Sequence, residues 1–159
     1  MKKLILGLMI LGIILGSAFP ILSAAGLYDK YLTVADVEKV TGRSGVKILI
    51  SNNQSAADDE VIFTTSDSKW LLTARYMAVR YLKDFKEDPA YIKAPVAGVG
   101  EEAYTGPKND PQYLILFRKG TYCVQLSASF NLDGDGNNPT MLTMDQLIAL
   151  GKIVASRLK

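Results

Sequence analysis

The stretch QYLILFRKGTYCVQLSASFNL, residues 112–132, decides the fold because it predicts an antiparallel β-hairpin. Two runs of apolar and β-branched residues flank Lys119 and Gly120, where we expect the chain to turn. Both alternating sets of side chains in the first arm are apolar. That arm is therefore expected to be a central strand that is covered on both faces.

The second arm of the hairpin separates its residue types by face. The apolar face belongs to the core and carries Tyr122, Val124, Leu126, Ala128 and Phe130. The other face is small and polar and carries Cys123, Gln125, Ser127 and Ser129. Two roles for this polar strip remain open: a helix packs closely over it, or it forms the floor of a binding groove with Tyr104 on its wall. The candidate ligand- or partner-binding residues are Gln125, Ser127, Ser129 and Tyr104.

Two helices are predicted by their termini. One covers residues 34–41 and ends at Gly42, and the other covers residues 143–158 at the end of the chain. Each starts with a capping box, in which a threonine and the residue three positions later exchange hydrogen bonds. The capping pairs are Thr33 with Asp36 and Thr143 with Gln146.

Three further strands are predicted outside the hairpin. Residues 45–51 and 60–66 are rich in β-branched side chains and are joined by a polar loop. A short strand at 101–105 follows Gly98 and Gly100, which favour unusual backbone angles.

The segment SKWLLTARYMAVRYLKDFKED, residues 68–88, is expected to form one long amphipathic helix. At about 100° per residue, its apolar side chains fall on one arc and its polar side chains on the opposite arc. Ser66 or Asp67 is expected to cap the start of this helix, and Pro89 to end it. The apolar arc carries Trp70, Leu71, Ala74, Met77, Ala78, Tyr81, Leu82 and Phe85.

These elements follow the order α-β-β-α-β-β-β-α. The order predicts an α+β fold, with a mostly antiparallel sheet of about five strands and helices on both of its faces. Residues 26–159 are expected to form a single domain of this kind, because they contain no internal repeat and no change in composition that would mark a second domain.

The first 25 residues have the order of charges and apolar residues that is typical of a signal peptide. Lys2 and Lys3 precede an apolar run at residues 4–16, and small residues lead to an expected cleavage site after Ala25. The alternative is an uncleaved membrane anchor, because no charged residue lies between Lys3 and Asp29. Either way the domain is expected to be exported, to the periplasm or the extracellular space, and it meets a membrane only if the leader stays uncleaved.

Composition excludes several classes of function. Histidine is absent, so Ser-His and Cys-His nucleophile pairs and His-ligated zinc or haem sites are excluded. Without Lys2 and Lys3 the chain has 16 basic and 16 acidic residues, a balance that predicts no nucleic-acid binding. Cys123 is the only cysteine and is expected to be a small buried side chain without a redox role.

The stretch NLDGDGNNPT, residues 131–140, resembles the start of a calcium-binding loop. Asp133 and Asp135 occupy ligand positions, but Asn138 replaces the required glycine and Met144 the bidentate glutamate. A plain turn between a strand and a helix accounts for the same residues. We therefore expect no calcium binding at physiological affinity, and no cofactor.

Three other groups were considered as sites. Met141 and Met144 are soft ligands for copper, but they are expected to fill the core. Glu101 and Glu102 point to opposite faces of a strand, and the acidic run at 58–60 is expected in a solvated loop. A carboxylate pair from distant elements remains an alternative, and with it a hydrolase of envelope polymers.

The LTVADVEKVTG helix, the GVGEEAY turn and the order of elements resemble small exported α/β/α domains of the PsbP/Mog1-like type. The resemblance spans most of the chain after the leader. It implies a binding or assembly role without naming a ligand. The sequence thus predicts a non-enzymatic, extracytoplasmic domain that recognises a partner protein or a small ligand, with a membrane-tethered accessory subunit as a further alternative.

Overall fold

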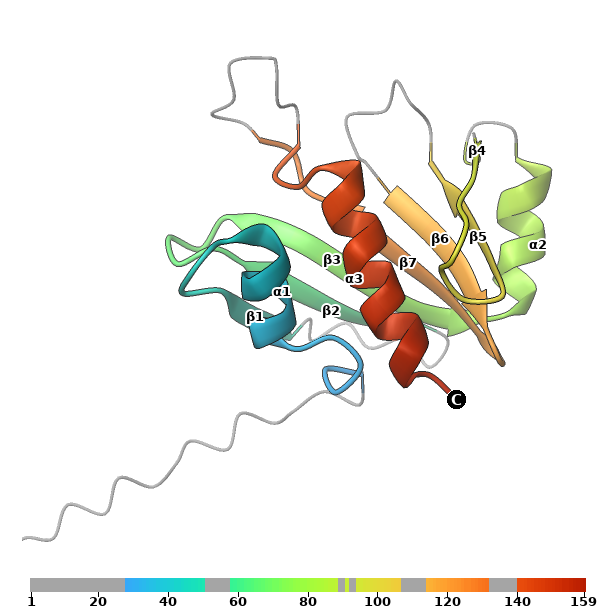
Figure 1. Ribbon diagram of the computed structural model, residues 1–159, viewed down its shortest axis with the longest axis horizontal. Coiled ribbons are helices and arrows are strands. Elements are labelled where there is room, and N and C mark those ends of the chain that lie inside the picture. Colours follow the sequence, from blue (N-terminus) through green and yellow to red (C-terminus); the bar gives the residue numbers. More distant parts are fainter. Residues whose placement is uncertain (1–27, 51–57, 89–90, 92–93, 107–113, 132–139) are drawn as a thin grey trace, which may run out of the picture.

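The computed structural model describes residues 28–50, 58–88, 91, 94–106, 114–131 and 140–159. Its strands form one sheet in the order β1-β2-β3-β7-β6-β5-β4, and every neighbouring pair is antiparallel (Figure 1). The strands are β1 (Lys47–Ile50), β2 (Asp58–Thr64), β3 (Trp70–Ala78), β4 (Ala94–Pro95), β5 (Glu102–Thr105), β6 (Leu114–Lys119) and β7 (Tyr122–Ala128). The helices are α1 (Val34–Thr41), α2 (Arg80–Glu87) and α3 (Met144–Arg157). The α+β class and the antiparallel sheet are confirmed.

The hairpin at the centre of the prediction is present as β6 and β7. Lys119 pairs with Tyr122 across a two-residue turn, and Gly120 in that turn has a φ of 57°. The first four residues of β6 are all buried, so this strand is covered on both faces as predicted. On β7 the core face is also as predicted up to Ala128, but Phe130 lies beyond the strand and is 40% exposed.

The long helix predicted over residues 68–88 is wrong in its first half. Residues 70–78 form β3, which pairs with β2 on one side and β7 on the other, and only residues 80–87 are helical. Buried apolar residues are adjacent at both ends of β3, as Leu71 with Leu72 and Tyr76 with Met77, so apolar and polar side chains alternate only in its middle. A helical arc accommodates that mixed pattern equally well.

The structure describes seven strands, against the expected five, and β3 is one of the two additional strands. The other addition is β4, a two-residue strand on the edge beside β5. The observed order of elements is therefore α-β-β-β-α-β-β-β-β-α.

Helices cover both faces of the sheet. On the first face α1 and α3 lie side by side (Figure 1), and their buried side chains join the main core with residues of β2, β3, β6 and β7. On the second face α2 covers one part of the sheet through Leu82. The smaller core beneath it contains Met77, Leu114, Leu116 and Cys123.

The caps predicted for α1 and α3 are confirmed, whereas the cap predicted at Ser66 or Asp67 is wrong, because α2 starts after Val79 without a side-chain cap. Thr33 and Thr143 each take part in a complete capping box, and Gly42 ends α1 with a φ of 70°. Gly151 lies in the buried stripe of α3, where a Cβ atom would come within 3.1 Å of the Val99 side chain. Glycine at this position therefore permits the helix to lie close to the sheet.

Arg157 joins the two helices of the first face. Its guanidinium donates hydrogen bonds to both carboxylate oxygens of Asp36, at 2.5 and 2.8 Å, and to the carbonyl of Tyr31. The Arg157 hydrogen bond lowers the pKa of Asp36 to about 2. The capping residue of α1 thereby also anchors the C-terminal end of α3.

The leader lies outside the described residues. Within the described part of the chain, none of the helices has the length and hydrophobicity needed to cross a bilayer.

Candidate functional site

Two of the four predicted binding residues lie together on the second face of the sheet. Gln125 donates a hydrogen bond of 2.9 Å from Nε2 to Oγ of Ser127, and both side chains are half-buried. Arg75 pairs with Gln125 and Thr73 with Ser127 across the β3–β7 ladder, so these four side chains share one face. The predicted polar strip is therefore present on this face. It lies between strand β2 on one side and the area that α2 covers on the other.

Tyr104 does not form a wall beside this strip. It lies on the same face, but Leu116 of β6 pairs with both Tyr104 and Gln125 and stands between them. The Tyr104 ring packs against the smaller core, and its hydroxyl donates a hydrogen bond of 2.5 Å to Glu102.

Ser129 belongs to a different place, a groove at the end of the sheet. Two cavities of about 440 Å³ each meet there. They share Lys69, Asn131 and Met141 as lining residues, so we treat them as one groove with a polar half and an apolar half, the end groove.

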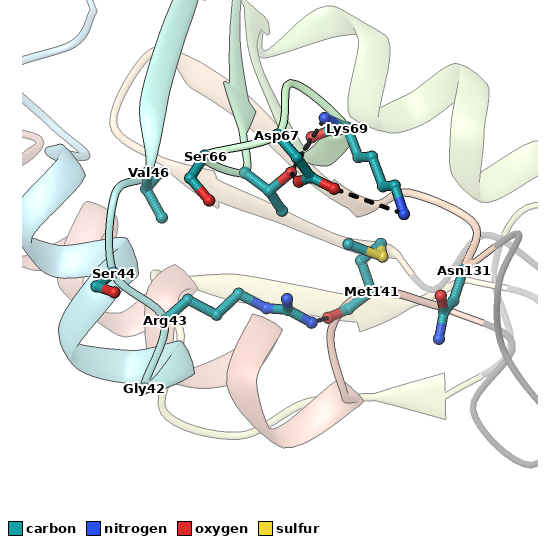
Figure 2. A pocket seen from close by; sticks show the side chains of 10 residues that line it. Gly42, Arg43, Ser44, Val46, Ser66, Asp67, Lys69, Asn131 and Met141 are labelled. Carbon is teal, nitrogen blue, oxygen red and sulfur yellow. Dashed lines mark hydrogen bonds and ion pairs between the residues drawn. The ribbon is translucent and has the colours of Figure 1, made fainter.

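The polar half lies between the chain after α1 and the turn from β2 to β3. Figure 2 shows Arg43 reaching across it toward Met141, with Ser66 and Lys69 on the opposite side. The other polar side chains that line this half are Ser44, Thr65, Asp67 and Asn131.

The β2–β3 turn positions Ser66, Asp67 and Lys69 through a compact set of hydrogen bonds. The Thr65 backbone N–H donates to the Lys69 carbonyl at 2.8 Å, and the Ser68 N–H donates to the Thr65 carbonyl at 2.9 Å. Ser68 has a φ of 67°, in the left-handed region that closes three-residue hairpins. The buried Thr65 hydroxyl donates to the Asp67 carboxylate.

On the other side, the end of α1 places Arg43. The left-handed Gly42 turns the chain out of the helix, and Nη2 of Arg43 donates a hydrogen bond of 3.3 Å to the Met141 carbonyl. Glu38 accepts a hydrogen bond from the backbone N–H of Val46 and fixes the return into β1.

The charges around the polar half are mostly positive. Asp67 lies 3.6 Å from Nζ of Lys69, and its pKa is lowered chiefly by the Thr65 hydroxyl and further by Lys69. Lys47 approaches the same turn and donates to the Ser66 carbonyl at 3.3 Å. No carboxylate of the described residues forms an ion pair with Arg43 or Lys47.

The apolar half of the end groove holds two exposed aromatic side chains. Trp70 is 55% exposed and Phe130 is 40% exposed, and both line this cavity with Ser129 and Met141. Large aromatic side chains are normally covered, so two in one hollow indicate an interaction site.

The carboxylates considered as catalytic groups are held in ion pairs. Glu101 and Glu102 lie 3.2 and 3.9 Å from Arg118, and Lys86 approaches Glu102 to 2.5 Å. The Lys86 contact is the main cause of the lowered pKa of Glu102.

The acidic run at 58–60 was expected in a loop, which is wrong, because these residues begin β2. Glu60 is paired with Arg75 at 2.9 Å.

Cys123 is buried on the second face, and burial raises the pKa of its thiol to about 12. No cluster of three or more cysteine, aspartate and glutamate side chains with the spacing of a metal site occurs within the part of the chain that the structure covers. The core of the calcium-like stretch, residues 132–139, lies outside that part. Met141 and Met144 both pack against the main core, as predicted, and Met141 also lines the end groove.

Sequence reasoning missed most of the end groove. Arg43, the adjacent pair Lys69 and Trp70, and Asn131 come from three places in the chain and show no common motif. The one available signal was the run TTSDS at 64–68, whose composition is typical of a turn between strands. A comparison of the chain with protein families, curated proteins and solved structures finds no match in any of the three.

Proposed function

We propose that this protein is a non-enzymatic, extracytoplasmic binding domain that holds a small ligand or a segment of a partner protein in the end groove. The observation that carries the proposal is the meeting of the polar and the apolar cavity at Lys69, Asn131 and Met141. Ligand sites are concave and combine apolar walls with a few placed polar groups. Each cavity, at about 440 Å³, has the volume of a small-ligand site.

The state of the carboxylates supports binding over hydrolysis. A glycosidase needs two carboxyl groups that face one substrate, one of them with a raised pKa. Asp67 is the carboxylate that lines the polar half of the groove, and its pKa is lowered. Glu102 lines a further cavity, beside α2, and its pKa is lowered as well.

Export and the PsbP/Mog1-like resemblance remain part of the proposal. The order of charge, apolar run and small residues supports passage across a membrane. A binding role is what the resemblance implies. If the leader is retained, the same domain acts as a membrane-tethered accessory subunit.

Two blocking variants test where the ligand sits. Ser66→Trp places a large side chain in the exposed turn at the polar half of the groove, and Ser127→Trp places one in the polar strip of β7. We expect native mass spectrometry of protein recovered gently from its host envelope to show a bound species in the wild type and in Ser127→Trp. The same species should be lost from Ser66→Trp.

Thermal unfolding of both variants is the control for folding, because Ser127 is half-buried and a bulky side chain there reaches neighbouring strands. If folded Ser127→Trp loses the bound species and Ser66→Trp keeps it, the polar strip is the site and the proposal for the end groove is refuted.

A further inference from the structure

We infer that the ligand of the end groove is a free amphipathic anion, with its acidic group at Arg43 and its apolar body against Trp70 and Phe130. This inference rests on the proposed binding function and adds the chemical class of the ligand.

The charge of the polar half selects an anion. Arg43 and Lys69 line it, Lys47 donates a hydrogen bond to the carbonyl of the lining residue Ser66, and Asp67 is the acidic side chain among its lining residues. Asp67 is already engaged by the Thr65 hydroxyl and by Lys69. The positive charge that stays unneutralised among the described groups is therefore that of Arg43 and Lys47.

Arg43 is arranged to receive an acidic group. Its guanidinium uses one N–H for the Met141 carbonyl, and an arginine carries five N–H donors. The bond to Met141 fixes the direction of the side chain across the cavity (Figure 2). A held guanidinium with spare donors binds a carboxylate or phosphate in a bidentate manner.

The apolar half selects the rest of the ligand. Trp70 and Phe130, which line this half, are 55% and 40% exposed. Because the two halves share Lys69, Asn131 and Met141, a molecule with its acidic group at Arg43 extends directly onto the aromatic side chains. Covering this surface removes apolar area from water and favours binding.

The proposal commits to a free molecule and not to a lipid within a bilayer. The cavities are hollows between loops, each with a volume suited to a small ligand. A membrane surface requires a broad basic face, whereas the charges here gather at one hollow.

Trp70 makes the test site-specific, because it is the only tryptophan of the chain and lines the groove. Its fluorescence is titrated with octanoate, octyl phosphate and 1-octanol, which share one apolar chain and differ in the charged group. We expect saturable changes with octanoate and octyl phosphate, and affinity for 1-octanol lower by about tenfold, the usual effect of a charge-assisted hydrogen bond. Octanoate binding should also weaken with added salt.

Arg43→Gln is the test variant and Lys83→Gln the matched control, because Lys83 is an exposed cation on α2, outside the end groove. Arg43→Gln should weaken octanoate binding by about tenfold and leave 1-octanol binding within about twofold. Lys83→Gln should change neither.

Three outcomes overturn the inference. Equal affinity for octanoate and 1-octanol, or no effect of Arg43→Gln, refutes recognition of the charge while leaving the groove as a binding site. Sedimentation of the protein with phosphatidylglycerol vesicles, abolished by Arg43→Gln, refutes the commitment to a free ligand. No response of Trp70 to any of the three compounds refutes the amphipathic class, and failure of the blocking variants separately refutes the proposed function.

Discussion

Single residues in this protein combine local backbone roles with long-range contacts. Ser68 closes the β2–β3 turn in a left-handed conformation that a side chain disfavours, and it also lines the end groove. Asp36 caps α1 and pairs with Arg157 of α3. These two positions allow sharp tests of the local geometry.

Ser68→Gly should stabilise the domain. A non-glycine residue in the left-handed region costs about 1–2 kcal/mol of stability. Glycine avoids this cost but loses more conformational entropy on folding. We therefore expect the free energy of unfolding to rise by about 0.5–1 kcal/mol. Urea unfolding of the variant measures the change. Ser66→Gly, in the same turn but without a positive φ, is the control and should not stabilise. Equal effects at the two positions would contradict the turn geometry.

Asp36→Asn should destabilise the domain at neutral pH and have little effect in strong acid. The Asp36 pKa is lowered from 3.8 to about 2 in the folded protein, so the charged carboxylate stabilises the fold fully above pH 3.8. That contribution is lost as the pH falls through about 2. We expect a difference of about 1–2 kcal/mol at pH 7, a range typical of charged hydrogen bonds near a surface.

The free energy of unfolding of the wild type and of Asp36→Asn is measured at neutral pH, near pH 3.8 and near pH 2, the pKa values of Asp36 in the unfolded and the folded protein. The difference between the two proteins should shrink along this series. A difference that stays constant down to the folded pKa would show that the Arg157 pair does not stabilise the fold through the Asp36 charge.

Among the elements, β3 departs most from expectation, and its pairing with β2 is directly testable. Glu60 and Arg75 face each other across the two strands, with an ion pair of 2.9 Å. A double-mutant cycle with Glu60→Gln and Arg75→Gln should give a coupling energy of about 0.2–1 kcal/mol, the range for cross-strand pairs. Glu60 and the exposed Lys83 of α2 form a control pair that should show none. Absence of coupling between Glu60 and Arg75 would contradict the strand.

Elements with local signals were predictable from sequence, and β3 was not. The capping boxes at Thr33 and Thr143 and the turn at Gly120 are determined by residues a few positions apart. The identity of β3 depends on β2 and β7 on its two sides, contacts that a local periodicity does not contain. Its bulge also places Leu71 and Leu72 in the same core, which disrupts the alternation expected of a strand.

The candidate site shows the same division between residues that local patterns place correctly and residues whose position depends on long-range contacts. Gln125 and Ser127 were placed correctly on one face, because alternation along a single strand is local information. Tyr104 was misplaced because its distance from that strip depends on Leu116 of the intervening strand. The end groove joins loops that are far apart in the sequence, so only the folded chain brings Arg43, Trp70 and Asn131 together.

At the scale of the whole molecule, the predicted cleavage of the leader after Ala25 can be tested directly. Tyr28 stacks on Tyr76 with ring centroids 4.7 Å apart, so the described domain includes Tyr28. We expect the intact mass of protein from its native host to correspond to a chain beginning at Gly26. A full-length mass confined to the membrane fraction would contradict cleavage and favour the tethered subunit.

The claim that the whole molecule serves to bind a ligand in the end groove is tested most directly by NMR with a library of small fragments. Each fragment is added to the ¹⁵N-labelled mature domain, and shifts of the backbone amide signals map where it binds. We predict that the shifts concentrate at Arg43, Ser66, Lys69, Trp70 and Asn131, at the junction of the two cavities. Shifts that concentrate instead at Gln125 and Ser127, or that show no common location, would contradict it.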